Sequence, residues 1–297
     1  MNLEYLLYIF IFFLIIILIL LWGLIIYNIK KNKILERENI IFEKRIIQGI
    51  ITTYSKLEVE ATRNKLKRLK KYIKKDPETL WKSARIFVKV NRVVKFSKEE
   101  QFQEIFKYLG IKGVLKKKIK DKDWYIKAKA IWLSYEFELE GNLQMVIPYR
   151  DVENTLVRRE AQIALVSFIG WKSLVFFPYV TRPMSLWQQI RIIEKLEETT
   201  NKLDLQYLDK ALLSKNEKVK ELLIRVIKNF KLEQYKYYII EQLFSDNKRL
   251  VDVAFETLKN LEITKKEIKG IESRFLEKRI ENQRMDIFNY LNTRILV

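Results

Sequence analysis

Arg158, Arg159 and Glu160 form the cluster in this sequence with the greatest capacity for chemistry. Guanidinium groups bind phosphate or carboxylate through two parallel hydrogen bonds, so adjacent arginines could grip an anion. The segment that follows, "AQIALVSFIG", turns apolar at helical spacing. The same three residues could therefore be the first turn of a structural helix. The pattern of the surrounding sequence distinguishes these two interpretations.

Glu136, Glu138 and Glu140 are the second candidate cluster, because carboxylate oxygens are the ligands that hard cations prefer. Their alternate spacing scatters the three side chains around a helix. We therefore interpret them as a solvated end of a helical unit rather than as a metal site.

The sequence contains no histidine and no cysteine. Serine–histidine and cysteine–histidine nucleophiles are therefore excluded, as are histidine-containing metal sites. No phosphate-binding glycine loop and no dinucleotide-binding fingerprint occurs. We predict a protein that is not an enzyme, with no catalytic residue, cofactor, bound metal or small-molecule substrate.

Residues 6 to 27, "LLYIFIFFLIIILILLWGLIIY", contain no charged side chain. As a helix this segment is about 33 Å long, enough to cross the hydrocarbon core of a bilayer. It lacks the cationic start and small-residue cleavage site of a signal peptide. We predict a transmembrane anchor over residues 1–27.

Cationic side chains follow this anchor closely, whereas only Glu4 and the amino terminus precede it. Lysine and arginine near a membrane stay on the cytoplasmic side. We expect a single-pass protein of the bacterial inner membrane, with its N-terminus outside and its C-terminal domain in the cytoplasm. The lack of cysteine fits a reducing compartment.

Residues 28–75 carry 15 basic and 5 acidic side chains, in a chain whose formal net charge is +20. We interpret this segment as a basic, helical juxtamembrane stalk. Three roles remain open for the cations of its last part, residues 63–75: a solvated helix face, contact with anionic headgroups, or binding of nucleic acid. The candidate contacts with the membrane surface are Lys30, Lys31, Lys33, Lys67, Arg68, Lys70 and Lys71.

Four segments align without gaps and begin at positions separated by 31, 62 and 31 residues. Their first residues are amino acids that prefer the N-cap of a helix: Asp123, Asn154, Asn216 and Asn247. Each segment presents an apolar stripe on one face. A missing member is expected near residue 185, with Leu186, Ile190 and Ile193 in its stripe. Helix pairs recurring about every 31 residues predict an all-α fold whose residues 76–297 form an α-solenoid.

The pattern D/N-x-x-V-R/K-x-x-A in these segments resembles HEAT repeats. It is closest to the short bacterial type that also occurs in phycobilisome-lyase-like proteins, and it covers roughly residues 76–297. The resemblance implies that Arg158 contacts a neighbouring unit. Three of the four caps are Asn rather than Asp. The position after the valine is Arg or Lys in the pattern, but it is occupied by Trp187 and Val251 in two of the segments. Because no bilin-attachment signature is present, the lyase activity is not carried over.

The segment "FFPYVTRPMSLW", residues 176 to 187, interrupts the regular pattern with two prolines and four aromatic side chains. Its aromatics either fill the core or form an exposed patch that anchors a partner, since Trp, Tyr and Arg dominate binding hot spots. The candidate partner-binding residues are Phe177, Tyr179, Arg182 and Trp187.

A solenoid offers a long surface and little preorganised chemistry, which suits protein recognition. We therefore expect a membrane-anchored scaffold that docks a partner protein. By analogy with similar bacterial proteins, the partner could belong to a membrane enzyme complex such as a polysaccharide glycosyltransferase. The alternative is a membrane-tethered protein that binds nucleic acid. The basic runs that this would need contain few aromatic side chains for base stacking, so we consider it less favoured.

Overall fold

The computed structural model describes residues 3–54, 59–73, 77–94, 108–198, 204–278 and 285–295. These residues form α-helices and short 3-10 helices, and none of them belongs to a β-strand. The all-α prediction is therefore confirmed for this part of the chain. The contacts divide the chain into two compact units, Met1–Val114 and Leu115–Val297, which are described separately.

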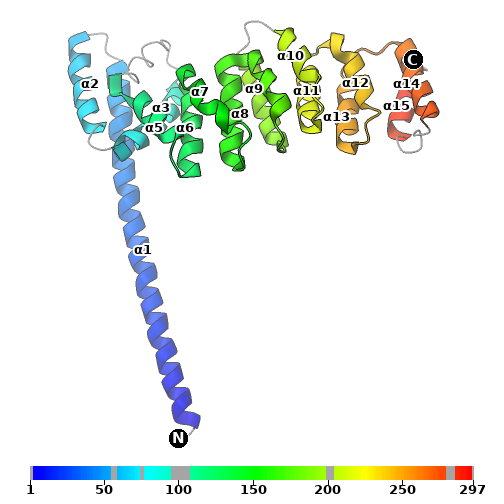
Figure 1. The fold of residues 1–297 in the computed structure, drawn as a ribbon. Coiled ribbons are helices and arrows are strands. Elements are labelled where there is room, and N and C mark those ends of the chain that lie inside the picture. Colours follow the sequence, from blue (N-terminus) through cyan, green and yellow to red (C-terminus); the bar gives the residue numbers. More distant parts are fainter. Residues whose placement is uncertain are drawn as a thin grey trace. The chain divides into compact units, whose positions relative to one another are not determined.

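The first unit begins with a single uninterrupted helix of 52 residues, α1 (Leu3–Tyr54), drawn in blue in Figure 1. From Phe10 to Tyr27 its apolar side chains are exposed, and the helix is long and apolar enough to cross a membrane. The sequence predicted an anchor over residues 1–27 and a helical stalk over residues 28–75. Instead, the helix that carries the apolar segment continues without a break to Tyr54.

The C-terminal part of α1 packs against two further helices, α2 (Val59–Ile73) and α3 (Pro77–Val94). Gly49 allows close approach here, because a Cβ atom at this position would lie 2.9 Å from Leu69 Cδ1. Farther back along α1, the Phe42 ring lies 5.8 Å from the ring of Tyr72. Helices α1 and α2 are therefore antiparallel.

The core of this unit combines residues from both sides of the predicted boundary at 75/76. Ile46 and Ile50 of α1 are fully buried, as are Ile73 of α2 and Phe87 of α3. Residues 77–94 thus share a compact unit with the basic segment, and the boundary between units lies at Val114 instead. Asp76 precedes this helix and is of a type that prefers the N-cap position, and it lies outside the described residues.

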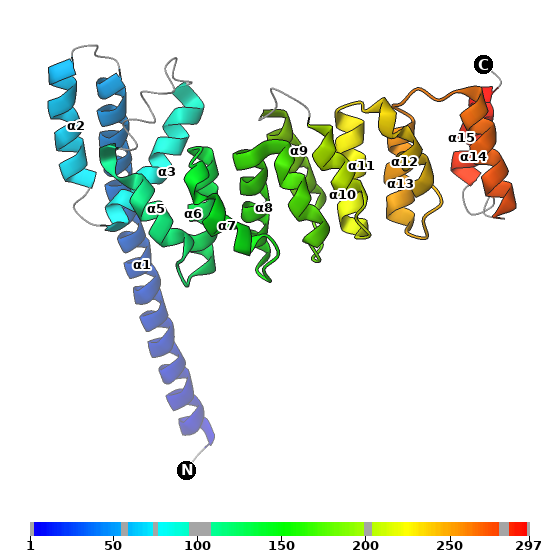
Figure 2. The same ribbon diagram turned by 45° about the horizontal axis from the view of Figure 1, so that its top comes forward.

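The second unit is a succession of helices of 3 to 15 residues (Figure 2). Helix α5 (Ile111–Ile119) contains the division between the units. The α-helices that follow are α6 (Trp124–Glu136), α7 (Leu143–Val146), α8 (Thr155–Ile169), α9 (Leu186–Glu198), α10 (Leu205–Leu212), α11 (Glu217–Asn229), α12 (Lys236–Gln242), α13 (Lys248–Leu258), α14 (Lys265–Glu277) and α15 (Met285–Ile295). The 3-10 helices are η1 (Glu140–Asn142), η2 (Ile147–Tyr149), η3 (Gly170–Tyr179) and η4 (Glu233–Tyr235).

Helices α6, α8, α9, α11 and α13 pack on one another in chain order and form one row. The elements between them cover this row: α7 and η3 pack on α8, α10 packs on η3 and α11, and α12 packs on α13. Helix α8 is also apolar enough to be a candidate membrane span, but most of its residues are buried within the unit. It is therefore a core helix.

The four predicted N-caps are all present. The side-chain oxygens of Asp123, Asn154, Asn216 and Asn247 each accept a hydrogen bond from a backbone N–H in the first turn of α6, α8, α11 and α13. Such a cap stabilises a helix by about 1 kcal/mol. At the other end of α8, Gly170 adopts a φ of 53° and ends the helix.

Polar contacts in this unit join residues that are close to one repeat period apart. The Asp151 carboxylate accepts a bond from the Thr181 hydroxyl at 2.6 Å, and Asn247 Nδ2 donates to Glu217 at 2.6 Å. Arg249 pairs with Glu221 at 2.9 Å. Each pair connects one predicted repeat segment to the next.

Candidate partner-binding surface

The irregular segment 176 to 187 is divided between the core and the surface. Phe177 of η3 is only 1% exposed, so its assignment as a partner contact is wrong. It lies in the 3-10 helix that packs between α8 and α10, where the aromatic ring fills the interior. Tyr179 and Trp187 are 68% and 52% exposed, and Arg182 is exposed as well. These three remain available to a partner.

Trp187 lies in the first turn of α9, beneath a cation from the neighbouring helix. The Arg159 guanidinium lies 4.8 Å from the centroid of the Trp187 ring. This distance is within the range of a cation–π interaction. Leu186 and Ile190, on the same helix, are both 44% exposed, so apolar surface surrounds the tryptophan.

This exposure corrects the predicted register of α9. Ile193 is buried as expected, but Leu186 and Ile190 are not, and Gln188 and Gln189 face the interior in their place. Gln188 donates a hydrogen bond to Gln162 of α8. A buried polar pair therefore replaces part of the apolar stripe, and α9 presents apolar side chains outward.

Arg159 is also tied to the buried part of α8. Its guanidinium pairs with Glu160 at 2.7 Å, and the other carboxylate oxygen of Glu160 accepts a bond from the Tyr135 hydroxyl at 2.9 Å. Burial raises the pKa of Tyr135 well above its usual range, and the negative charge of Glu160 adds to this effect. The cation above Trp187 is thus held by a bonded network rather than by solvent.

A small hollow of about 150 Å³ continues this surface over α6 and α8. It is lined by Tyr125, Ala128, Lys129, Trp132, Leu156 and Glu160. Glu160 connects the hollow to Arg159 and Trp187. We call the region formed by Tyr125, Trp132, Leu156, Trp187 and Ile190 the aromatic surface.

The hydrogen bonds of Arg158 lie in the turn before its own helix. Its guanidinium donates to the carbonyl oxygens of Val152 and Glu153, at 2.7 and 2.8 Å, and so fastens the turn before its own helix. Burial lowers its pKa, and the charge of Arg182 lowers it further. The polar link toward the segment near residue 185 is made by Asp151, which bonds Thr181 and Arg182.

Asp151 holds the backbone next to the exposed Arg182. Besides the Thr181 hydroxyl, its carboxylate accepts bonds from the backbone N–H groups of Thr181 and Arg182, at 3.1 and 3.2 Å. Burial raises the pKa of Asp151, but these hydrogen bonds outweigh it and hold the pKa below its ordinary value. The loop that carries Arg182 is therefore fixed in position.

The predicted membrane-surface cations fall into two groups on the first unit. Lys30, Lys31 and Lys33 are exposed on α1 directly after its apolar segment. Lys67, Arg68 and Lys71 are exposed on α2, whereas Lys70 is half-buried with its ammonium group 4.0 Å from the centroid of the Tyr108 ring.

The two groups lie at different distances from a bilayer that the apolar segment would cross. Tyr72 lies beside Phe42, which is about 22 Å along the helix from Tyr27. The α2 cations are at this level or farther away, because α2 runs antiparallel from there. The headgroup layer is only about 5–8 Å thick and electrostatic screening acts over about 8 Å. With α1 across a bilayer, only the α1 group reaches the headgroups.

The three glutamates that the sequence singled out lie at the end of α6 and in the turn and 3-10 helix that follow it. Glu136, Glu138 and Glu140 line one pocket, but the described residues contain no group of three acidic side chains arranged to hold a metal ion. Of the aromatic surface, sequence reasoning found Trp187 but missed Tyr125, Trp132, Leu156 and Ile190, and it missed the contact of Arg159 with the tryptophan ring. A tryptophan where HEAT-like repeats carry a basic residue was the available signal that this helix is unusual.

Comparison with known proteins adds no assignment. No protein-family profile matches the chain, and no curated protein sequence is significantly similar to it.

Proposed function

We propose that this chain is a membrane-anchored, non-catalytic scaffold whose second unit, a HEAT-like α-solenoid, docks a partner protein on the aromatic surface. The observation that carries the proposal is the outward-facing Trp187, stacked under Arg159 beside an apolar hollow. Tryptophan and arginine are the side chains most enriched in binding hot spots. Here the Arg159 guanidinium is held above Trp187 by its ion pair with Glu160, without a partner protein.

The solenoid is supported by the contacts between successive segments. The row from α6 to α13 is built from neighbours in chain order, and the polar links connect residues 28 to 31 positions apart. These spacings agree with the repeat of about 31 residues. Each unit buries its apolar face against the next, as in other repeat proteins.

The proposed orientation places the N-terminus outside and the second unit in the cytoplasm of a bacterial cell. It depends on the cations that follow the apolar segment on α1. Replacing Lys30, Lys31 and Lys33 by glutamine is expected to shift a substantial fraction of the molecules to the inverted orientation, because the charge bias across the span is reduced. Paired reporter fusions at the C-terminus, one active only in the cytoplasm and one only outside it, measure this fraction.

The matched control is the substitution of Lys67, Arg68 and Lys71 by glutamine. It removes the same charge from α2, beyond the reach of the headgroups, and should leave the orientation unchanged. An external C-terminus in the unaltered protein would overturn the proposed topology.

Capture of the partner is tested by placing a photoreactive phenylalanine derivative at position 187 of the full chain in native membranes. We expect an adduct of discrete size after illumination. The control position is Tyr237, another aromatic side chain that is 72% exposed but lies on α12, outside the aromatic surface. Equal adducts at both positions, or none at 187, would contradict the proposal. Mass spectrometry of the adduct asks whether the partner belongs to a membrane enzyme complex such as a polysaccharide glycosyltransferase.

The second candidate function is nucleic-acid binding by the α2 cations. The observation in its favour is that Lys67, Arg68 and Lys71 are exposed and lie too far from the bilayer to contact its headgroups. Retention of DNA or RNA that falls steeply between 50 and 200 mM salt would support it. Loss of that retention on replacing the three residues by glutamine would locate the site.

A further inference from the structure

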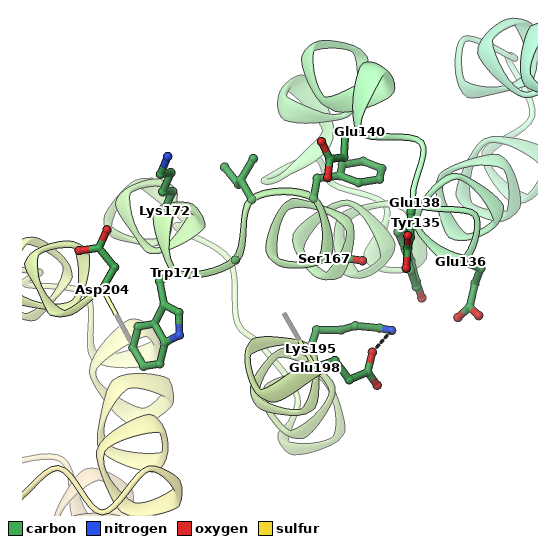
Figure 3. A pocket seen from close by; sticks show the side chains of 13 residues that line it. Tyr135, Glu136, Glu138, Glu140, Ser167, Trp171, Lys172, Lys195, Glu198 and Asp204 are labelled. Atoms are coloured by element: carbon green, nitrogen blue, oxygen red, sulfur yellow. Dashed lines mark hydrogen bonds and ion pairs between the residues drawn. The ribbon is translucent and has the colours of Figure 1, made fainter. Parts of the chain in front are cut away.

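A pocket of about 630 Å³ lies where the carboxyl ends of three helices meet (Figure 3). Its walls include residues from the end of α6, the end of α8 and the last turn of α9. The carboxyl end of a helix carries a partial negative charge of about half an electron, because its last carbonyl groups lack partners within the helix. Three such ends favour a cation in the space between them.

The side chains that line this pocket reinforce that preference. The pocket has five carboxylates and two lysines, in a chain that is strongly basic as a whole. The carboxylates are Glu136, Glu138, Glu140, Glu198 and Asp204. One lysine, Lys195, is paired with Glu198. The pocket is therefore an acidic concavity on a cationic protein.

An unsatisfied donor gives the second, independent indication of a ligand. Trp171 lines the pocket and is only 4% exposed, and its Nε1 atom has no hydrogen-bond partner. Figure 3 shows the nitrogen on the edge of the indole ring that faces the space toward Lys195. A buried N–H without an acceptor costs free energy, so it favours a ligand that brings an oxygen.

We propose that this pocket binds a lysine- or arginine-bearing peptide segment of a partner protein. The cationic side chain lies among the carboxylates, against the aromatic wall formed by Phe168 and Tyr135, and the indole N–H of Trp171 donates to a backbone carbonyl of the same segment. A free polyamine matches the charge but has no acceptor for Trp171. The inference deepens the proposed scaffold function by naming the chemistry of a partner, and it uses a site separate from the aromatic surface.

The test uses the full chain in nanodiscs of neutral phosphatidylcholine, which does not attract basic peptides. The probe is a fluorescein-labelled, N-acetylated peptide of alternating arginine and glycine, and its anisotropy reports binding. We expect saturable binding that weakens with salt. A peptide with glutamine in place of arginine should not bind.

Two variants locate the site. Glu138→Gln with Glu140→Gln removes two exposed carboxylates and should raise the Kd about fivefold. Trp171→Phe keeps the ring but removes the donor and should raise the Kd to a similar extent. The charge-matched control is Asp246→Asn with Asp252→Asn, two exposed carboxylates outside the pocket, which should leave the Kd within about twofold of its original value. Circular dichroism verifies that each variant keeps its helix content.

Three results would overturn the inference: no saturable binding, equal weakening by the control, or displacement of the probe by spermidine together with no effect of Trp171→Phe. The last of these results would identify a polyamine site.

Photocrosslinking at position 187 is independent of this measurement. Loss of the adduct with peptide binding intact would reject the aromatic surface as the docking site, and the reverse result would reject the pocket.

Discussion

Replacement of Phe177 by alanine is expected to lower the free energy of unfolding of the second unit by about 3–5 kcal/mol. The side chain is fully enclosed by the elements around η3, so the truncation leaves a cavity that the packed helices cannot close. The urea midpoint of the ellipticity at 222 nm, measured on the full chain in detergent, should fall clearly.

The matched substitution two residues later separates the core from the surface. Tyr179 is 68% exposed, and Tyr179→Ala should change the stability by no more than about 0.5 kcal/mol. The two variants therefore divide the irregular segment into a part that supports the fold and a part that can meet a partner. Equal destabilisation by both would show that Tyr179 also belongs to the core.

The second large effect is expected at the ionic link between α11 and α13. Glu221 is only 3% exposed, and it pairs with Arg225 at 3.3 Å and with Arg249 at 2.9 Å. Replacing both arginines by methionine leaves a buried carboxylate without an ion-pair partner. The cost of such a change is about 3–5 kcal/mol, mostly the free energy of desolvating an uncompensated charge.

The reverse substitution should cost much less. In Glu221→Leu the two arginines remain, with side chains 26% and 54% exposed, and water can solvate them. Adding Glu221→Leu to the double arginine variant should therefore restore most of the lost stability, as judged from urea midpoints. Independent, additive effects of the three substitutions would contradict this interpretation.

The parts of the fold that could be predicted from the sequence depend on local rules. Capping requires only a short polar side chain before an apolar stripe, so Asp123 and the three asparagines could be assigned to helix starts. Gly170 could be assigned to a helix end because its left-handed backbone conformation is unfavourable for other residues. The apolar segment at the N-terminus is readable from composition alone.

The parts that could not be predicted depend on contacts between helices. The helical period allowed α9 to bury either Ile190 or Gln188, and the choice depends on the hydrogen bond from Gln188 to Gln162 of a different helix. Phe177 and Tyr179 are both aromatic, and only the packing of η3 distinguishes them. Arg159 makes a cation–π contact because Trp187, 28 positions later in the sequence, lies beneath its guanidinium group.

The unbroken length of α1 has a mechanical consequence. Ile50 is buried in the core of the first unit and lies about 35 Å along the helix from the end of the apolar segment. If α1 spans a bilayer, a tilt of the segment in the lipid displaces the far end of the same rigid helix. Tilting it by about 10°, well within the range that bilayer thickness imposes on such helices, moves Ile50 sideways by about 6 Å. With α1 across a bilayer, the position of the first unit would therefore depend on the thickness of the membrane.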